Sequence, residues 1–453
     1  MCQTGGSLRV VLISTYELGR QPFGLASPAA WLREAGAEVV CLDLARQELD
    51  EDVLRTAGAI AFYLPMHTAT RLAIPVIRRA RELNPAAHLC AYGLYAPVNA
   101  ALLREMGVRT IAGGEFEEAL LTLVHPGPAA LISLGKQRFL TPDRSGLPPL
   151  EQYAQLVWPG GARRTVGYTE TSRGCKHLCR HCPVVPVYQG HFRIVQRDIV
   201  MEDIRWQVAA GAQHITFGDP DFFNGIGHAI ELVRALHDEF PQVTYDATIK
   251  VEHLLQHCKY LPLLRETGCA FVVSAVESVD DYVLGHILEK GHTRADFVCV
   301  TRMFRELGLA LAPTFVAFHP WMTLQGYAEL LASIAGLDLV EHVSPVQLSI
   351  RLLVPAGSRL LELPEGRAAI GEFDEDALSY RWTHPDARVD ALQRELEAAI
   401  ARAVTAKEGR RAIFRRAWEM THAAMAMRAP RLPDVPPGRA RVTIPYMTEP
   451  WYC

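Results

Sequence analysis

The sequence lacks any apolar run of about eighteen residues, the length that a membrane-spanning helix requires. Its start, Met-Cys-Gln-Thr-Gly-Gly, has neither the basic nor the apolar region of a signal peptide. Internal repeats and low-complexity blocks are also missing. We therefore expect a cytoplasmic protein that has no membrane partner.

An excess of charge of one sign is missing too. The formal net charge is −4, with 46 Lys and Arg against 50 Asp and Glu. This balance gives no electrostatic basis for binding nucleic acid. One basic stretch, formed by Arg410, Arg411, Arg415 and Arg416, falls on an expected helix. We interpret it as a solvated face rather than a site for a polyanion.

Cysteine is present, but not in the pattern of a disulfide scaffold. The ten cysteines are spread along 453 residues with no export signal, so their thiols are expected to stay reduced. We interpret five of them as core thiols, namely Cys41, Cys90, Cys258, Cys269 and Cys299. Three others crowd into one short segment, and such a group indicates metal or redox chemistry.

Residues 1–124 alternate short apolar strands with helical segments. The expected strands are 9–14, 38–42, 59–63, 88–92 and 109–111. This alternation predicts an α/β domain with a doubly wound, Rossmann-like parallel sheet. Ligands of such sheets bind beyond the carboxyl ends of the strands. Residues 125–164 are rich in Pro and Gly, which predicts a linker or a strap.

A second alternating region covers residues 165–362. Its expected strands are 166–171, 214–218, 243–250, 271–278, 309–318 and 346–353. These units predict a partial (β/α)6 barrel, whose catalytic groups would lie at the carboxyl ends of the strands. Residues 363–453 predict a helical extension, with one long helix over 386–421 and a Pro-rich stretch from Pro430.

The strongest chemical signal is the segment Ser-Arg-Gly-Cys-Lys-His-Leu-Cys-Arg-His-Cys-Pro, which begins at Ser172. Its spacing lets one loop bring the thiolates of Cys175, Cys179 and Cys182 to a single 4Fe-4S cluster. Three protein ligands leave the fourth iron open to the amino and carboxylate groups of a ligand. The reduced cluster could then pass one electron to a bound sulfonium and break a carbon–sulfur bond.

Other interpretations of this segment stay open. A zinc ion could be held by the cysteines together with His177 or His181, which would make the protein a sensor or scaffold without catalysis. The thiols could also be structural. The segment follows the first expected strand of the second region, where barrel chemistry belongs, and this position favours the catalytic interpretation.

This segment resembles the radical S-adenosylmethionine (SAM) superfamily, over about residues 165–355. The resemblance implies a 4Fe-4S cluster and SAM as cofactors, with the residue before the third cysteine covering the adenine. The segment 215–221 stands where the family holds the SAM amino group, but it departs from the usual two glycines and a glutamate. The expected cofactor-binding residues are His181, Gly218, Asp219, Asp221, Ser274, Glu277 and Arg351. Ser274 and Glu277 are three residues apart on one strand, so only one of them should point into the barrel.

A narrower resemblance covers most of the chain. The segments Thr-Ser-Arg-Gly-Cys-Lys-His, His-Ile-Thr-Phe-Gly-Asp-Pro-Asp-Phe, Ile-Lys-Val-Glu-His and Thr-Glu-Pro-Trp-Tyr-Cys look like radical SAM proteins with a CUAEP or CCAEP tail. Members end in Cys-Cys-Ala-Glu-Pro, or carry selenocysteine at the second position. This sequence ends at Cys453, the first residue of such a tail. We hypothesise a selenoprotein whose selenocysteine codon was read as a stop, with Cys453 as a catalytic residue.

The first domain resembles the cobalamin-binding-like domain that precedes many radical SAM barrels. The similarity lies in residues 22–26, 32–39 and 113–115. The Asp-x-His-x-x-Gly loop that supplies a histidine to cobalt is absent after the first strand, and His67 does not replace it. The resemblance therefore allows cobalamin without a protein histidine, but we favour an empty scaffold.

Together these patterns predict a radical SAM enzyme that acts on an unidentified small-molecule or metalloid substrate. The resemblance implies an electron donor such as flavodoxin or ferredoxin. Three reactions stay open, which are hydrogen abstraction by a 5′-deoxyadenosyl radical, methyl transfer and transfer of a 3-amino-3-carboxypropyl group. The alternative is a non-catalytic iron–sulfur or zinc protein.

Overall fold

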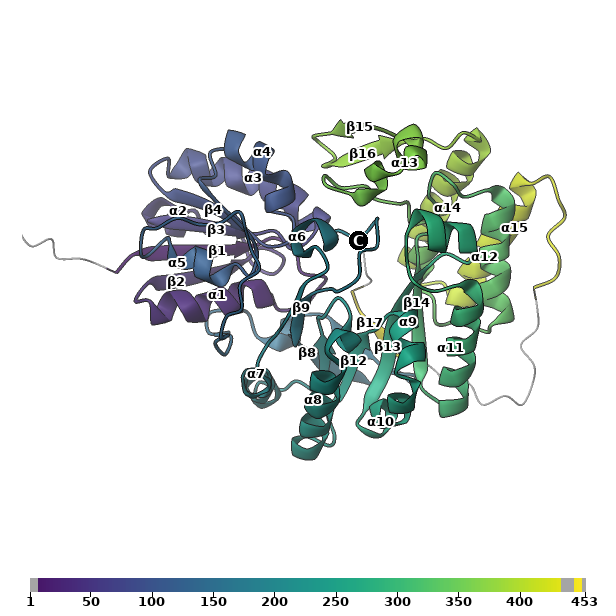
Figure 1. The fold of residues 1–453 in the computed structure, drawn as a ribbon, viewed down its shortest axis with the longest axis horizontal. Helices are drawn as coiled ribbons and strands as arrows, with labels where there is room; N and C mark the ends of the chain where they lie inside the picture. The colour runs from purple at the N-terminus through teal and green to yellow at the C-terminus, as the bar shows by residue number, and fades with distance from the viewer. Residues whose placement is uncertain (1–6, 433–443, 450–453) are drawn as a thin grey trace, which may run out of the picture.

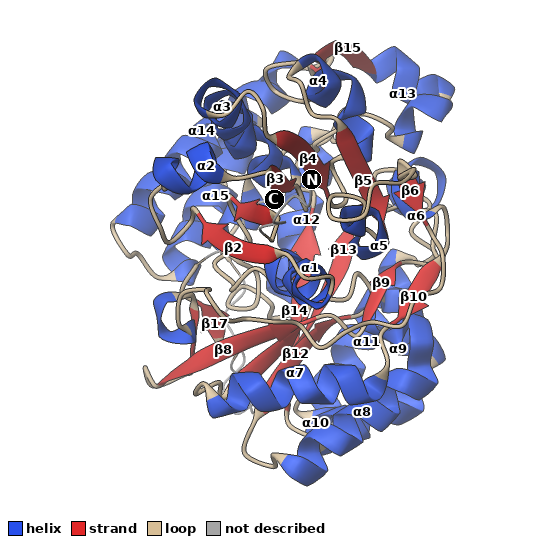
Figure 2. Cartoon of the chain, turned by 90° about the vertical axis from the view of Figure 1, so that its left-hand side faces the viewer, coloured by secondary structure: helices blue, strands red, loops and turns tan. Residues whose placement is uncertain are grey.

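A computed structural model describes residues 7–432 and 444–449 (Figure 1). The chain forms two parallel sheets followed by a mostly helical extension. The view turned by 90° places the first sheet above the second, with α7, α8 and α10 below the second sheet (Figure 2).

The first sheet is doubly wound and parallel, with the strand order β2-β1-β3-β4-β5-β6. Its strands are β1 Arg9–Ser14, β2 Glu38–Asp43, β3 Ala59–Tyr63, β4 His88–Tyr92, β5 Thr110–Gly114 and β6 Ile132–Ser133. Helices α1 Phe23–Glu34 and α5 Glu117–Leu121 pack on one face. Helices α2 Glu51–Thr56, α3 His67–Leu83 and α4 Ala100–Glu105 pack on the other. Because both faces are covered, the strands are apolar runs without alternation, as predicted.

The second sheet has the strand order β14-β13-β12-β11-β8-β7-β17. Its parallel strands are β8 Arg163–Thr169, β11 His214–Phe217, β12 Thr244–Thr248, β13 Cys269–Glu277 and β14 Ala310–Phe315. Strands β7 Gln155–Val157 and β17 Tyr446–Met447 extend the sheet in antiparallel pairing. The partial barrel is therefore confirmed.

Helices cover the outer face of the second sheet and build the main core. They are α7 Arg197–Ala209, α8 Ile226–Glu239, α9 Val251–Gln256, α10 Leu261–Glu266, α11 Arg294–Leu307 and α12 Leu324–Gly336. The inner face carries a smaller apolar cluster that includes Val166, Phe271 and Val273. Ile444 and Met447, near the end of the chain, pack against this cluster.

One expected strand of the barrel does not form. The segment predicted as a strand over 346–353 begins with a 3-10 helix, Pro345–Leu348, and meets the barrel only through an isolated bridge between Phe318 and Arg351. Pro345 lacks an amide hydrogen and has a fixed φ, which favours the start of a helical turn over strand pairing. Five parallel strands with one bridge replace the six expected strands.

The extension contains α13 Pro364–Ala369, the hairpin β15 Ile370–Asp374 and β16 Ser379–Trp382, and helices α14 Ala387–Thr405 and α15 Arg410–Ala424. The single long helix predicted over 386–421 is therefore wrong. It breaks at Lys407, which has a φ of 55°, and α15 begins after Gly409. Left-handed backbone and glycine both end helices, so the two halves pack as a helical pair.

The strap over 125–164 does more than join the two domains, because it forms part of the structure of each. It supplies β6 to the first sheet and β7 to the second. Arg144 of the strap makes a bidentate ion pair with Asp203 of α7, with nitrogen–oxygen distances of 2.7 and 2.8 Å. The same guanidinium donates to Gln21 of the first domain and to the carbonyl of Tyr168 in the barrel.

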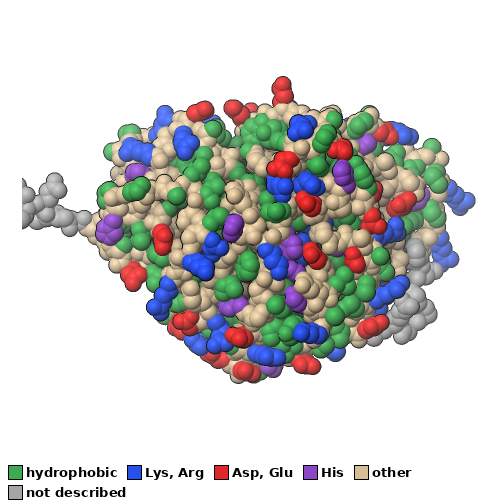
Figure 3. Space-filling model, in the orientation of Figure 1, with side chains coloured by type: hydrophobic (Ala, Val, Ile, Leu, Met, Phe, Trp, Pro, Cys, Tyr) green, Lys and Arg blue, Asp and Glu red, His purple; other side chains and the backbone are tan. Residues whose placement is uncertain are grey.

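Basic and acidic side chains are interspersed on the face of the molecule in Figure 3, with no continuous field of either sign. This distribution agrees with the small net charge of −4. In residues 7–432 and 444–449, no helix combines the length and the apolar character that crossing a membrane demands.

Candidate functional site

The three clustered cysteines lie on a loop that leaves the carboxyl end of β8. The strands β9 Ser172–Gly174 and β10 Phe192–Ile194 pair antiparallel and close the base of this loop. A short helix, α6 Val185–Tyr188, forms its far side. We call residues 175–191 the cluster loop. Its place at the carboxyl edge of the second sheet is the one predicted for catalytic groups.

Gly174 allows the backbone just before Cys175 to pack closely against Tyr188 and His191. Its φ is 74°, and a Cβ atom there would lie 2.3 Å from the ring of Tyr188 and 2.5 Å from the carbonyl oxygen of His191. Only glycine tolerates both the left-handed backbone and this close contact. The Arg-Gly-Cys order therefore has a steric reason in the folded loop.

All three cysteines of the loop have free thiols, and Cys175 and Cys179 are buried. Burial, together with the neighbouring thiols of Cys179 and Cys175, raises the pKa of Cys182 to about 12. Burial also raises the pKa of Cys175. Burial therefore favours the protonated thiols of Cys175 and Cys182, and a soft metal centre that displaces protons from the loop would gain three thiolate ligands.

A buried cation and a buried carboxylate lie beside these thiols. The Nζ atom of Lys290 is 3.4 Å from Glu277, whose Oε1 atom is also 3.2 Å from Nε2 of His181. Burial alone would raise the pKa of Glu277, but Lys290 and His181 more than offset this effect and lower it to about 2. The ammonium of Lys290 can thus offset part of the negative charge that a thiolate-bound cluster brings.

Two expected cofactor-binding residues therefore come together, because His181 and Glu277 are in contact. A β-bulge between Ala275 and Glu277 makes this contact. Glu277 has a φ of 68°, which turns its side chain toward the cluster loop. The register shift and this left-handed backbone lie directly at Glu277, where β13 ends.

Ser274 lies elsewhere. It is fully buried on the face of β13 that packs against the helices, and its hydroxyl donates to the carbonyl of Ile249 at 2.7 Å. The hydroxyl therefore faces the outer core, and contact of Ser274 with the cofactor stays a prediction. Ser274 and Glu277 do differ in direction, as the strand geometry predicts.

Arg351 is also engaged away from the cluster loop. Its guanidinium pairs with Asp390 at 2.7 Å and stacks on the ring of Trp382, whose carbonyl accepts a further hydrogen bond. Both partners belong to the extension. Arg351 therefore joins the barrel to the extension, and its contact with the cofactor stays a prediction.

The segment after β11 holds the base of the cluster loop. Asp219 is buried and accepts hydrogen bonds from the amide and hydroxyl of Thr171, at 3.1 and 2.7 Å, and from the hydroxyl of Ser172. Burial raises its pKa to about 6, although these hydrogen bonds lower it in part. A Cβ atom at Gly218 would lie 2.0 Å from the hydroxyl oxygen of Tyr168, so glycine permits this packing. Both residues lie at the expected edge, and contact with SAM remains a prediction.

Asn224 and Asp221 complete this edge. Asn224 accepts from the backbone amide of Lys176 at 3.4 Å and lies 3.8 Å from the sulfur of Cys175. Asp221 is fully buried and lies 2.6 Å from Nδ1 of His253, at the start of α9. The roles of Asn224, His253 and Lys290 were missed in the sequence, because each is one polar residue whose partners lie far away in the chain.

Arg173, directly before Gly174, joins the cluster loop to the first domain. Its guanidinium is buried and contacts three carboxylates, those of Glu117 at 2.7 Å, Glu170 at 2.7 Å and Glu115 at 3.5 Å. Glu115 follows the end of β5 and Glu117 begins α5, so both belong to the first domain. The segment 113–115, which resembles part of a cobalamin-binding-like domain, therefore supplies Glu115 to this ion-pair cluster.

Aromatic rings fill the adjoining carboxyl ends of β3 and β4. The ring centroids of Tyr63 and Tyr92 are 5.3 Å apart, and that of Phe116 lies 6.0 and 5.0 Å from them. All three rings are buried. A Cβ atom at Gly24 of α1 would lie 2.1 Å from the Tyr63 ring, so helix α1 packs directly against this aromatic cluster.

The last described residues of the chain cover the ends of β1 and β2. Glu449 pairs with Arg46 at 2.9 Å and lies against Gly19, where an added Cβ atom would come within 2.4 Å of its carboxylate. Thr448 exchanges hydrogen bonds with the backbone of Gln155 in β7. Cys453, the expected catalytic tail residue, lies outside the described residues.

A cavity of about 1400 Å³ borders the same terminal segment. It lies between the inner face of β13 and β14, helix α15 and residues 444–449, and its polar lining includes Arg163, Thr314 and Gln347. Among the described residues, no cysteine lines it. The cavity is therefore separate from the cluster loop and offers room inside the half-barrel for a second molecule.

The Arg173 cluster generates a prediction for the pH dependence of stability. Burial raises the pKa of Glu115 to about 7, and Glu117 and Glu170 add to this effect while Arg173 opposes it. The folded state therefore prefers protonated Glu115. The protonated carboxyl of Glu115 contributes on the order of 3 kcal/mol to the free energy of unfolding. This contribution is complete below about pH 4.5 and is lost as the pH rises through about 7.

We expect Glu115→Gln to flatten the fall in melting temperature between pH 5 and pH 8, because the amide cannot ionise. Thermal melts of the holoprotein at several pH values measure this slope. The exposed neighbour Glu118 provides the control, since Glu118→Gln should keep the wild-type slope. An unchanged slope in Glu115→Gln would contradict the prediction.

Comparisons with known proteins support this picture at the level of the fold. No protein-family model matches the chain. Over 152 residues the chain is 24% identical to the hopanoid C-3 methylase of Methylococcus capsulatus, a match that spans 34% of this chain and 29% of that relative.

Two solved structures are similar over most of the chain. The radical SAM methyltransferase TsrM from Kitasatospora setae, with cobalamin and a 4Fe-4S cluster bound, has a TM-score of 0.58 at 18% identity and 74% coverage of each chain. The cobalamin-dependent radical SAM enzyme OxsB, with aqua-cobalamin bound, has a TM-score of 0.66 at 14% identity, covering 88% of this chain and 67% of its own. The chain therefore has the fold of the cobalamin-dependent radical SAM enzymes.

Proposed function

We propose that this protein is a radical SAM enzyme that cleaves SAM reductively at a 4Fe-4S cluster held by Cys175, Cys179 and Cys182. The observation that carries the proposal is three thiols on one loop at the carboxyl edge of a half-barrel, beside a buried lysine. The fold shared with TsrM, whose structure contains a 4Fe-4S cluster, and with OxsB, whose structure contains SAM, supports it.

The donor set fits such a cluster and leaves one iron free. Three thiols of the loop can ligate three irons, and the nearby His177 and His181 are engaged with His253 and Glu277 instead. When bound, the cluster would supply one electron to the sulfonium of SAM, which breaks one carbon–sulfur bond and leaves a thioether and a carbon radical.

The residues of this chain would bind SAM and exclude water. His181, fixed by Glu277, presents an imidazole ring beside the third cysteine, where the adenine is expected. Asp219 holds the base of the loop through Thr171 and Ser172, so the edge that would receive the SAM amino group is rigid. Arg180 and Arg359 hold the outer side of the loop through hydrogen bonds to backbone carbonyls of His286 and Leu178.

The first test is cluster loading of cysteine variants. Cys175→Ala, Cys179→Ala and Cys182→Ala should each abolish the cluster, because two thiolates cannot hold it in this loop. Iron and sulfide analysis after anaerobic reconstitution measures loading. Cys269→Ala is the matched control, since Cys269 is buried in β13 away from the loop and should keep the iron content.

The activity itself is tested with the loaded wild-type protein, dithionite and SAM. Mass spectrometry should detect 5′-deoxyadenosine or methylthioadenosine, and the product identifies the bond that breaks. A fully loaded protein that forms neither product would favour a sensor. A loop that takes up zinc and no iron would overturn the proposal.

The residues of the first domain do not fit cobalamin, although the similar structures of TsrM and OxsB hold it. A doubly wound sheet binds ligands at its switch point, here the carboxyl ends of β1 and β3. Tyr63 ends β3 and packs against α1, while Glu449 and Arg46 cover the ends of β1 and β2. We propose that this domain is a scaffold.

This proposal predicts the outcome of corrinoid reconstitution. Protein incubated with hydroxocobalamin under reducing conditions should lose it on gel filtration, because the edge that would hold it is filled by protein. Absorbance in the corrin bands of the protein fraction measures retention. One corrinoid retained per chain would contradict the scaffold assignment.

We further propose that the chain is related to the radical SAM proteins with a CUAEP or CCAEP tail. The described terminal segment 444–449 pairs with β7 and reaches the first domain through the ion pair of Glu449 with Arg46. The nucleotides after the Cys453 codon test this relation. A UGA codon followed by codons for Ala-Glu-Pro is expected, and any other stop codon there would contradict it.

The proposed reaction also suggests an electron donor, a substrate class and a cellular location. A cluster that must be reduced for each turnover needs a one-electron donor, and we propose a flavodoxin or a ferredoxin. The substrate would be a small molecule or a metalloid compound in the half-barrel. A reduced cluster and free thiols fit the cytoplasm, where we propose that the protein acts.

A further inference from the structure

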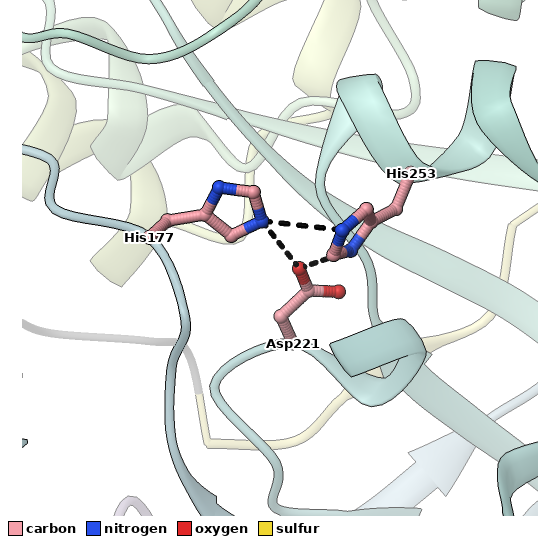
Figure 4. Close-up of side chains that lie close together, drawn as sticks. All are labelled: His177, Asp221 and His253. Carbon is pink, nitrogen blue, oxygen red and sulfur yellow. Dashed lines mark hydrogen bonds and ion pairs between the residues drawn. The ribbon is translucent and has the colours of Figure 1, made fainter. Parts of the chain in front are cut away.

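Three side chains with metal-binding groups meet beside the cluster loop without using its cysteines (Figure 4). His177 lies on the loop between Cys175 and Cys179, Asp221 follows the end of β11, and His253 lies at the start of α9 after β12. Their ligand atoms all lie within 4.8 Å of one another. Within the described residues, no other group of this kind was found.

His253 is at the centre of this group. Its Nε2 atom faces Nε2 of His177 at 3.2 Å, and its Nδ1 atom lies 2.6 Å from Oδ2 of Asp221. Oδ2 of Asp221 is also 3.7 Å from Nε2 of His177. In a tetrahedral zinc site with bonds of about 2.0–2.1 Å, two nitrogen ligands lie about 3.3 Å apart. The two imidazoles already have that separation.

Two atoms of the group are buried and have no hydrogen bond within the described part of the chain. Nδ1 of His253 and Oδ2 of Asp221 are close, but their angle does not meet hydrogen-bond geometry. The side chain of His253 is 1% exposed and that of Asp221 is 0% exposed. A buried polar atom without a partner is costly, so this pair indicates a missing ligand.

The charges nearby favour a cation. Oε2 of Glu252 lies 3.5 Å from Nδ1 of His177, so this imidazole has a carboxylate on its Nδ1 side in addition to the carboxylate of Asp221 in the donor group. Lys250 pairs with Glu252 at 3.3 Å and neutralises only one of the two carboxylates. Carboxylates on the Nδ1 side orient metal-binding imidazoles and strengthen them as ligands.

A hydrogen bond between the two histidines is the simpler alternative. A proton shared between the Nε2 atoms would account for their distance of 3.2 Å. It would leave the contact between Nδ1 of His253 and Oδ2 of Asp221 without a hydrogen bond. A divalent ion between the two Nε2 atoms would bind both imidazoles and would take Oδ2 of Asp221, 3.7 Å from Nε2 of His177, as a third ligand.

We propose that His177, Asp221 and His253 form a second metal site for a zinc-class divalent cation, separate from the iron–sulfur cluster. Two imidazoles and one carboxylate suit borderline metals such as Zn²⁺. The ion would tie the cluster loop to the ends of β11 and β12. Because His177 is 16% exposed, a further coordination position would face solvent and accept water or an anionic ligand.

The test measures zinc and iron in the same protein. Anaerobically reconstituted holoprotein, whose loop cysteines are occupied by the cluster, is dialysed against micromolar ZnCl₂ and then against metal-free buffer. Elemental analysis should find about one zinc per chain in addition to the cluster iron. His253→Gln and Asp221→Asn lie outside the loop and should weaken zinc binding by about tenfold or more, with the iron content unchanged.

Two further variants make the outcome decisive. His177→Gln should lose zinc in the same way. His257→Gln is the matched control, because His257 follows α9 with its ring 5.8 Å from that of His253 but lies outside the donor group. Zinc retained by both His253→Gln and Asp221→Asn, or no zinc bound to wild-type holoprotein, would overturn the proposal. If the protein binds no zinc at this site, the test of SAM cleavage still stands, because it measures the products of SAM and not zinc.

Discussion

The buried guanidinium of Arg173 is the constraint on which the site depends. It stands two residues before Cys175 and is surrounded by Glu115, Glu117 and Glu170. Taking these charges from water is expensive, and only the mutual pairing offsets the expense. A misplaced first domain would leave a buried cation unpaired. The ion-pair cluster therefore couples the position of the first domain to the conformation of the cluster loop, which no apolar contact could do as selectively.

That coupling gives the first domain a use that needs no cofactor. Its carboxyl edge, where a doubly wound sheet would bind a ligand, faces the barrel instead. Glu115 and Glu117 bind Arg173, the ring of Tyr63 packs against α1, and Arg46 binds Glu449 near the end of the chain. In this fold the edge forms an internal interface. The cavity bordered by residues 444–449 shows that free volume lies inside the half-barrel, away from this edge.

The sequence was sufficient for the regular elements and for the thiol loop. Strands such as Arg9–Ser14 and Ala59–Tyr63 are continuous apolar runs, because both faces of their sheet are buried. The predicted strand over 346–353 and the predicted single helix over 386–421 failed where local backbone preferences prevail, at Pro345 and Lys407. Contacts between residues far apart in the chain were missed as well. Nothing near His253 in the chain signals Asp221 and His177. The contact between Glu277 and His181 is equally invisible in the sequence, because 96 positions separate the two residues.

The cluster loop carries two kinds of donors, and their positions separate them. The thiols of Cys175, Cys179 and Cys182 are soft ligands suited to iron–sulfur chemistry, whereas His177 and His181 are harder ligands on the intervening turns. In the fold His177 meets His253 and His181 meets Glu277, so neither imidazole is directed to the thiols. A zinc knuckle would instead need one histidine to join the three cysteines in a single tetrahedron. The partners of the two histidines thus favour an iron cluster with one open corner.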